Sequence, residues 1–311
     1  MNKILVCCLG GTIGSKVNED GVIKLSATLD KTFFDKMRVK AEYKIVTPII
    51  YSSENADIKY YKDALNGIVK AAQDIMPDAV LVLHGTDSMA YFTHLAHRVL
   101  SYMNLPLIVT GAKYPPDDPH SDAVRNVKFA LDLLSAAIDS RSGSLTFGLV
   151  YSDAFMGQAT FVQAAKVLDA DFAGEYKKFA GMPQIEPLDR EESEAFLAST
   201  KEPRILTIPD VPGFPFESID VTKYDAILVE AYHSGTQNSK TLPTLVHRAS
   251  SKGIKCYLAP VHSTHIKKEG ADKSKEAPYD SEVVLKDAGI IPLVDVPFES
   301  AWAQVVIEAT K

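Results

Sequence analysis

Short apolar runs alternate along the chain with stretches in which apolar residues recur at helical spacing. A short apolar run predicts a buried strand, and strands that alternate with amphipathic helices predict parallel βαβ units. A charged, proline-containing stretch interrupts this alternation after Met182, and a second series follows it. The predicted strands cover residues 3–9, 43–48, 79–83, 107–110 and 145–151 in the first series and residues 205–208, 226–230, 254–259 and 290–294 in the second.

The segments between these strands each carry one apolar face. Leu65, Ile68 and Ala72 recur at helical spacing, and so do the apolar residues from Val124 to Leu134. This pattern predicts an α/β protein with two open, mainly parallel, three-layer α/β domains, the second smaller than the first. The predicted boundaries are residues 1–185 for the N-terminal domain, 186–203 for a linker and 204–311 for the C-terminal domain.

Composition and charge narrow the classes of function. The chain has 311 residues and a net charge of -7, so it would repel a nucleic-acid backbone, and small molecules are the expected ligands. The opening apolar run is too short for a signal sequence or a membrane span, which predicts a cytoplasmic protein with no membrane partner. Three cysteines, two of them adjacent, lack the spacing of a disulfide framework or a metal site. We therefore expect buried free thiols and no metal.

The loop after the first predicted strand reads Gly10-Gly11-Thr12-Ile13-Gly14. In an open parallel sheet, ligands bind beyond the carboxyl ends of the strands. The two glycines allow a tight turn and leave the Thr12 hydroxyl facing the crevice, where it can act as a nucleophile. Two further roles stay open, because Thr12 can cap a turn and the glycines can cradle a phosphate. The segment matches neither the dinucleotide fingerprint nor a Walker loop, which weakens the nucleotide alternatives.

Two more strand-end loops carry hydroxyl groups. His84-Gly85-Thr86-Asp87-Ser88 follows the strand at residues 79–83, and Thr86 or Asp87 is also a suitable N-cap for the next helix. Tyr51-Ser52-Ser53-Glu54-Asn55 offers short hydroxyl side chains and backbone amides that suit a carboxylate. Because the loops end strands of one sheet, they jointly predict a small-ligand site, in which Asp87 aligns a base or binds an ammonium group.

These three segments, together with Val109-Thr-Gly-Ala112 and Ser121-Asp122, resemble the bacterial-type L-asparaginase and glutaminase family. The family pattern has a Gly-Gly-Thr-Ile-Gly start, a Ser-containing substrate loop and a His-Gly-Thr-Asp-Thr/Ser-Met segment. The resemblance implies a reaction in which a Thr attacks the side-chain amide, forms an acyl-enzyme and releases ammonia before water cleaves the ester. It also implies that no metal or organic cofactor is needed, and that the chain assembles as a homodimer or homotetramer.

The resemblance implies a role for each matched residue. Thr12 is the expected nucleophile, and Thr86 and Asp87 correspond to the Thr–Asp pair of the family. Asp87 is also expected to hold the amino group of the substrate, while Ser52 and Ser53 bind its α-carboxylate.

The remaining parts of such a site are donors for the oxyanion and a base for the hydroxyl. Loop amides around Gly11 and Ala112 are the expected oxyanion donors, and a Thr hydroxyl is a poor nucleophile until a base or relay removes its proton. This sequence has Val22 where the family carries a Tyr, and Gln163 stands nearest to the position of the family's Lys. Lys166, one helical turn further on, is the expected substitute.

The predicted function is hydrolysis of the side-chain amide of L-asparagine or a related small amide. Three alternatives stay open. A non-catalytic amino-acid sensor of the same fold would keep Ser52 and Asp87 without the activating residues, in agreement with Val22 and Gln163. A transfer-RNA-linked amidotransferase subunit would use related chemistry, but the acidic balance argues against RNA binding. The third alternative, a Rossmann-type nucleotide enzyme, has only the fold class to support it.

Overall fold

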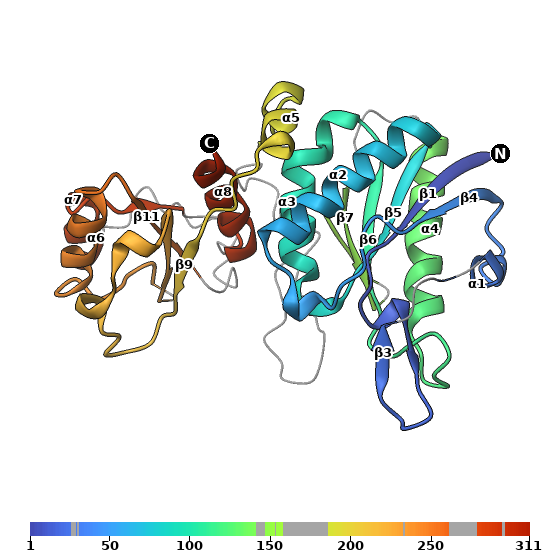
Figure 1. Cartoon of the computed structure of the whole chain (residues 1–311), viewed down its shortest axis with the longest axis horizontal. Helices are drawn as coiled ribbons and strands as arrows, with labels where there is room; N and C mark the ends of the chain where they lie inside the picture. Colours follow the sequence, from blue (N-terminus) through green and yellow to red (C-terminus); the bar gives the residue numbers. More distant parts are fainter. Residues whose placement is uncertain are drawn as a thin grey trace. The chain divides into compact units, whose positions relative to one another are not determined.

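The computed structural model divides into two compact units (Figure 1). The first unit contains the N-terminal residues and residues 186–198, and the second contains residues 199–311. The structure describes residues 1–25, 29, 31–140, 147–152, 154–157, 186–232, 234–260, 279–293 and 296–311.

A six-stranded sheet forms the centre of the first unit, with the described strands in the order β4-β1-β5-β6-β7-β8 (Figure 1). The strands are β1 (Asn2–Cys8), β4 (Ala41–Val46), β5 (Ala79–Leu83), β6 (Leu107–Thr110), β7 (Phe147–Tyr151) and β8 (Ala154–Gly157). Neighbouring strands pair in parallel, except that β8 runs antiparallel to β7. The predicted α/β class with mainly parallel sheets is confirmed.

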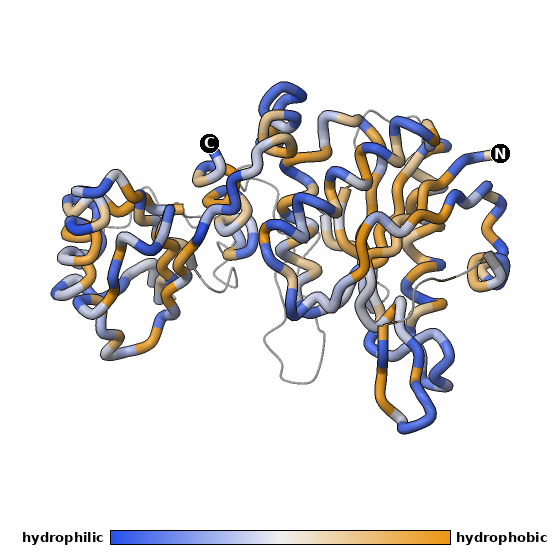
Figure 2. Tube along the Cα trace, viewed as in Figure 1, coloured by the Kyte–Doolittle hydropathy of each residue, from blue (hydrophilic) through white to orange (hydrophobic). Residues whose placement is uncertain are grey.

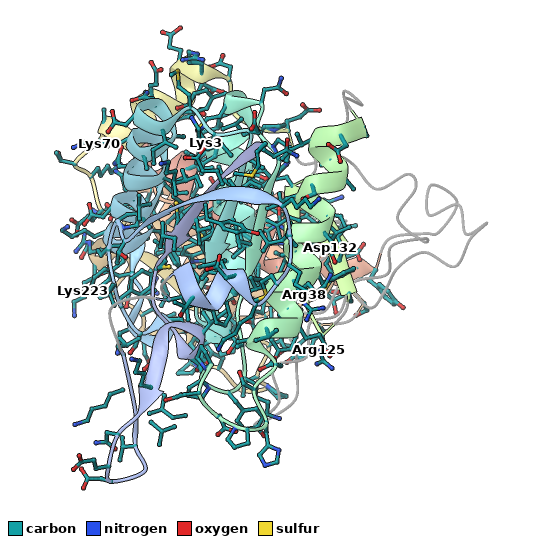
Figure 3. All side chains as sticks on the ribbon, turned by 90° about the vertical axis from the view of Figure 1, so that its right-hand side faces the viewer. Lys3, Arg38, Lys70, Arg125, Asp132 and Lys223 are labelled. Atoms are coloured by element: carbon teal, nitrogen blue, oxygen red, sulfur yellow. The ribbon has the colours of Figure 1, made fainter. Side chains whose placement is uncertain are left out.

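Helices cover both faces of this sheet, which gives the first unit three layers. They are α1 (Lys31–Asp35), α2 (Ile58–Ile75), α3 (Met89–Leu100), α4 (Ala123–Ser140) and α5 (Arg190–Ala198). Helices α2 and α3 lie on one side of the sheet and α4 on the other (Figures 1 and 3). Alternate residues of β1, such as Ile4 and Val6, pack in one core cluster with Val127 and Leu131 of α4. Hydrophobic residues are concentrated along the strands (Figure 2).

The buried face of α4 differs from the predicted one at its first turn. Val124 is exposed, whereas Asn126 is fully buried. Asn126 takes the inward position because its side chain forms hydrogen bonds with the loop between β6 and α4 and with the loop after β7, as described below. An apolar pattern alone does not identify a polar residue of this kind.

A two-stranded antiparallel hairpin follows the first loop and was not predicted. It consists of β2 (Ser15–Val17) and β3 (Ile23–Leu25). Its apolar side chains are exposed, including Val22 at 52%. Figure 2 shows the hydrophobic residues of this hairpin away from the core of the sheet. The hairpin buries too little surface to produce the apolar pattern of an ordinary strand.

Residues 186–198 do not form an extended connection, although they begin the predicted linker. Residues Arg190–Ala198 form helix α5, and Phe196 and Leu197 are buried. The N–H of Leu188 donates to the carbonyl of Arg98 at 2.8 Å, which ties the segment to the first unit. The charged run that suggested a linker is the solvated face of a helix. The other predicted domain boundaries remain predictions.

The second unit contains a four-stranded parallel sheet in the order β12-β11-β10-β9. Its strands are β9 (Ile205–Ile208), β10 (Ala226–Ala231), β11 (Lys255–Pro260) and β12 (Ile291–Pro292), and its helices are α6 (Leu242–Ser250), α7 (Asp280–Asp287) and α8 (Phe298–Thr310). Core residues of α6 and α7 pack on β10 and β11, while α8 contacts the same strands through pairs such as Tyr257 and Glu308. Among the described residues, no helix is long and apolar enough to cross a membrane.

Short 3-10 turns complete the described structure. They are Thr12–Gly14, Ser53–Asn55, Thr86–Ser88, Ser101–Met103, Phe216–Ser218 and Val221–Lys223. The first three follow strands or lie in loops of the first sheet, and they contain the predicted hydroxyl groups.

Candidate functional site

The two Gly-Thr loops lie at the topological switch point of the first sheet. Strand β4 pairs on one side of β1, whereas β5 and the strands that follow it lie on the other side. The chain therefore reverses its direction of winding between β1 and β5, where open α/β sheets bind their ligands. The N–H of Leu9 donates to the carbonyl of Leu83 at 2.9 Å, so the pairing of β1 and β5 continues to the start of both loops.

These two loops touch through their backbones. Gly11 has a φ of 72°, and a Cβ atom at this position would lie 2.2 Å from the Cα of Gly85. Only glycine permits such an approach. Thr12 and Thr86 directly follow these two glycines, so backbone contact brings together the loops that carry both predicted catalytic hydroxyls.

Neither threonine serves as a helix cap. The 3-10 turn that begins at Thr12 has Gly11 as its N-cap, with no side-chain capping bond. Helix α3 has Ser88 as its N-cap, also without such a bond, and Thr86 and Asp87 lie in the preceding 3-10 turn. The capping role that the sequence left open therefore does not hold for these residues. Thr12 and Thr86 are half-buried and Asp87 is exposed.

The third loop joins the second through two side-chain hydrogen bonds. The buried Ser53 donates from Oγ to Oδ2 of Asp87 at 3.3 Å, and Ser88 donates from Oγ to the carbonyl of Ser53 at 2.7 Å. Ser52 is half-buried beside them. The arrangement places hydroxyl groups next to a carboxylate, and such a cluster can bind an amino acid through its ammonium and carboxylate groups.

The fourth loop, after β6, is held by Asn126. Its Nδ2 donates to the carbonyl of Gly111 and to Oδ2 of Asp122, both at 2.9 Å, and its Oδ1 accepts from the N–H of Ser152 at 3.1 Å. A Cβ atom on Gly111 would lie 3.2 Å from Cγ2 of Thr86. Ala112, a predicted oxyanion donor, is buried in this loop. The structure thus brings the loops of Gly11, Ser53, Thr86 and Ala112 to one end of the sheet.

A buried tyrosine and a buried histidine, neither of them predicted to have a role, lie beneath these loops. The hydroxyl of Tyr51 lies 2.9 Å from Nε2 of His84, and Nδ1 of His84 lies 2.8 Å from the carbonyl oxygen of Gly85. Burial lowers the pKa of His84 to about 4, because the imidazolium would lose its hydration, and burial also raises the pKa of Tyr51. The sequence feature that could have drawn attention to His84 is its position directly after an apolar strand.

Three predicted residues bear on activation of the nucleophile, namely Val22, Gln163 and Lys166. Lys166 and Gln163 lie outside the residues that the structure describes. Val22 lies on the exposed hairpin, where its N–H donates to Oδ1 of Asn18 at 2.7 Å. In the described part of the chain, no group of three or more His, Cys, Asp or Glu side chains is placed to hold a metal ion.

A cavity of about 360 Å³ lies at the opposite end of the sheet from these loops. It is lined by Asn2 at the start of β1 and by charged residues that include Arg38, Lys128 and Asp132. Figure 3 shows Arg38 near Asp132 of α4, and Asp132 forms an ion pair with Lys128. None of the predicted site residues lines this cavity.

Sequence comparison identifies related proteins. Residues 3–148 match the family model described as Asparaginase, N-terminal. L-asparaginase of Thermococcus kodakarensis is 24% identical over 317 residues, a match that covers 98% of this chain and 92% of that protein. A glutamyl-tRNA(Gln) amidotransferase subunit of Methanopyrus kandleri is 28% identical over 132 residues, or 40% of this chain. The matched segment spans only 28% of that relative's length.

Solved structures share the fold of the whole chain. The thermostable L-asparaginase from Thermococcus kodakarensis superposes with a TM-score of 0.70 at 19% sequence identity, covering 98% of this chain and 92% of that one. L-asparaginase I from Vibrio cholerae gives a TM-score of 0.71, also at 19% identity, and covers 100% of this chain and 93% of that one. At this level of identity the likeness establishes the two-domain α/β fold.

Proposed function

We propose that this chain belongs to the asparaginase family, whose N-terminal model matches residues 3–148, and that it is an amidohydrolase with Thr12 as its nucleophile. The proposed substrate is L-asparagine or a related small amino-acid amide, from which the enzyme releases ammonia. Subunits of one kind form a dimer or tetramer in the cytoplasm under this proposal.

One observation carries the proposal. Thr12 and Thr86 follow two adjacent strands at the switch point of the sheet, and their loops touch at Gly11 and Gly85. Within the described structure neither half-buried hydroxyl caps a helix, so capping does not explain the place of these residues. Their position at the ligand-binding edge of an open α/β sheet suits a reacting group.

The proposed reaction has two steps. Oγ of Thr12 attacks the amide carbon of the substrate, the hydroxyl proton passes to the leaving nitrogen, and the C–N bond breaks to give an ester and ammonia. Water then attacks the ester carbon, which returns the hydroxyl to Thr12 and releases a carboxylic acid. Backbone amides around Gly11 and Ala112 stabilise the oxyanion of each step.

The other residues bind the substrate or move the proton. Asp87 carries a negative charge that attracts the substrate's ammonium group, and Ser53 holds this carboxylate through its hydrogen bond. Ser52 and Ser53 together bind the α-carboxylate. Lys166 deprotonates Thr86, which relays the proton from Thr12, in place of the family lysine, to whose position Gln163 stands nearest.

Measurement of ammonia tests the proposal directly. Purified protein is incubated with L-asparagine, D-asparagine and L-glutamine beside two matched variants, Thr12→Ala and Thr12→Ser. We expect release from at least one substrate by the wild type, loss of release in Thr12→Ala and partial activity in Thr12→Ser, which keeps a hydroxyl. If the wild type releases no more ammonia than Thr12→Ala, the proposed hydrolase activity on these amides is wrong.

The exposed hairpin supports a second candidate function. Val22, at 52% exposure, stands where the family carries an activating tyrosine. A protein without that hydroxyl can still bind an amino acid at Ser53 and Asp87 and serve as a sensor. This alternative predicts that aspartate or asparagine raises the melting temperature of the protein while no ammonia appears.

A further inference from the structure

Tyr51 connects three of the four loops of the site. Its N–H donates to the carbonyl of Leu9 at 3.2 Å, and its backbone forms an isolated parallel bridge with Gly10, two residues before Thr12. Its hydroxyl lies 2.9 Å from Nε2 of His84, at the start of the second loop. Ser52 follows it in the chain. A single side chain and its backbone therefore link the loops that carry the two threonines and the serines.

His84 is locked by aromatic neighbours. Its ring stacks on Phe92 with centroids 4.7 Å apart at an interplanar angle of 26°, and it meets Tyr51 edge-on at 5.7 Å and 83°. The side chain is 1% exposed. Since both ring nitrogens have a partner inside the protein, the imidazole has no free nitrogen with which to reach a substrate.

The partners of the ring determine its tautomer. Burial keeps the imidazole neutral, because it lowers the pKa to about 4. A neutral imidazole has one N–H, and the carbonyl oxygen of Gly85 can only accept a hydrogen bond. Nδ1 therefore donates to Gly85, and Nε2 accepts the hydroxyl proton of Tyr51.

The bond to Gly85 acts on Thr86 through the peptide plane. The carbonyl of Gly85 and the N–H of Thr86 belong to one planar group, so a fixed oxygen fixes the plane from which the Thr86 side chain departs. The 3-10 turn at Thr86–Ser88 has no side-chain cap at its start. Its entry angle thus depends on this hydrogen bond and on the contact between Gly85 and Gly11.

We propose that Tyr51 and His84 are positioning residues, which orient the Gly85–Thr86 peptide so that Thr86 and Asp87 face Thr12. The proposal rests on the amide hydrolysis proposed above and assigns neither residue a contact with substrate. Tyr51 holds the imidazole through Nε2, His84 holds the Gly85–Thr86 peptide through Nδ1, and this peptide positions both the relay hydroxyl of Thr86 and the ammonium-binding carboxylate of Asp87.

Two substitutions of His84 separate its two hydrogen bonds. In His84→Asn, the side-chain amide takes the place of Nδ1 and can still donate to Gly85. In His84→Gln, the amide takes the place of Nε2, so the contact with Tyr51 remains and the bond to Gly85 is lost. We expect His84→Asn to retain most of the kcat, and we expect a fall of roughly 100-fold with a raised KM in His84→Gln, because a misplacement of about 1 Å costs that much.

A control substitution accounts for general damage to the fold. His97, near the end of α3, is also buried and packs edge-on against Phe147 at 5.1 Å. We expect His97→Asn to lower stability without changing KM, since loss of folded protein reduces the amount of enzyme and not its affinity. Equal kinetic defects in His84→Asn and His84→Gln, or an unchanged KM in His84→Gln, would overturn the proposal.

A spectroscopic measurement tests the tautomer without reference to catalysis. Nitrogen NMR of the histidine rings should show a protonated Nδ1 and an unprotonated Nε2 at His84, and the same tautomer in Tyr51→Phe, because the carbonyl of Gly85 still accepts from Nδ1. A protonated Nε2 in the wild type contradicts the assignment.

Calorimetry with aspartate completes the test. Aspartate binding that His84→Gln weakens and His84→Asn preserves supports the positioning role even if no amide is turned over, and equal binding by both variants opposes it.

Discussion

Glycines with similar positive φ angles serve different purposes in the two units. Gly11 in the first unit and Gly213 in the second have φ values of 72° and 77°. A Cβ atom on Gly11 would lie 2.2 Å from the backbone of the neighbouring loop, whereas nothing lies within 4 Å of such an atom on Gly213. Gly213 only makes a turn, but Gly11 allows two loops to touch. Close backbone contact beside reactive side chains therefore distinguishes the candidate site from an ordinary connection.

The largest expected effect comes from a substitution that places a Cβ atom in the contact between the two loops. Gly11→Ala should destabilise the protein by about 3–5 kcal/mol, because it adds a clash with backbone to the cost of a positive φ. Gly213→Ala incurs only the cost of the positive φ, about 1 kcal/mol. Urea unfolding of both variants measures the difference, and ammonia release should be lost in Gly11→Ala alone. Equal destabilisation of the two variants would show that the contact between loops is unimportant.

The stability of the first unit should depend on pH more strongly than that of the second. Among the described residues, the buried histidines, His84, His94 and His97, all lie in the first unit. The pKa of His84 falls from 6.5 when unfolded to about 4 when folded. Between these values the unfolded chain binds a proton that the folded chain does not, so stability decreases as the pH falls through this window, by roughly 3 kcal/mol in full.

Hydrogen exchange can locate this pH effect. Protection of the amides of β5 should decrease between about pH 6.5 and about pH 4 more than protection of the amides of β10. His84→Asn removes the titrating group and should reduce the loss at β5. If β5 in the variant loses as much protection as in the wild type, His84 is not the source of the pH dependence.

The smallest of the three effects comes from a side-chain amide that holds a loop at the end of a strand in each unit. Asn126→Ala leaves the carbonyl of Gly111 and the N–H of Ser152 without their buried partner, at a cost of about 2 kcal/mol. Gln237 plays a comparable part in the second unit, where it donates to the carbonyl of Glu230 at 2.8 Å and accepts from Asn238 at 2.9 Å.

Both substitutions should lower the melting temperature, but they should differ in their effect on turnover. Asn126 holds the loop of Ala112, so Asn126→Ala should also reduce ammonia release. Gln237→Ala serves as the control and should leave it unchanged. Similar turnover by both variants would indicate that the loop of Ala112 takes no part in catalysis.

Strands buried on both sides were predicted best. The observed β5 and β6 match residues 79–83 and 107–110, because a strand covered by helices must be apolar throughout. The hairpin at Ser15–Leu25 and the helix at Arg190–Ala198 were missed. Both expose most of their surface, so their sequences lack the apolar pattern on which the prediction depends.

The loops of the site were predicted for a topological reason. Thr12 and Thr86 follow apolar runs, and parallel strands place their carboxyl ends along one edge of a sheet. Tyr51 and His84 could not be assigned a role in this way. Their importance depends on a hydrogen bond across 33 positions of the chain, and no local pattern of residues encodes such a contact.

The two adjacent thiols of β1 give the strand before the nucleophile loop a native chemical probe. Cys7 and Cys8 are buried, and burial raises the pKa of Cys8 to about 11 and that of Cys7 further. Thiolates, not thiols, react with disulfide reagents, so both cysteines are inert while the strand stays in the sheet. The rate at which these two thiols are labelled consequently reports how often the end of β1 separates from the sheet. The two cysteines lie only a few residues before Thr12 in the chain.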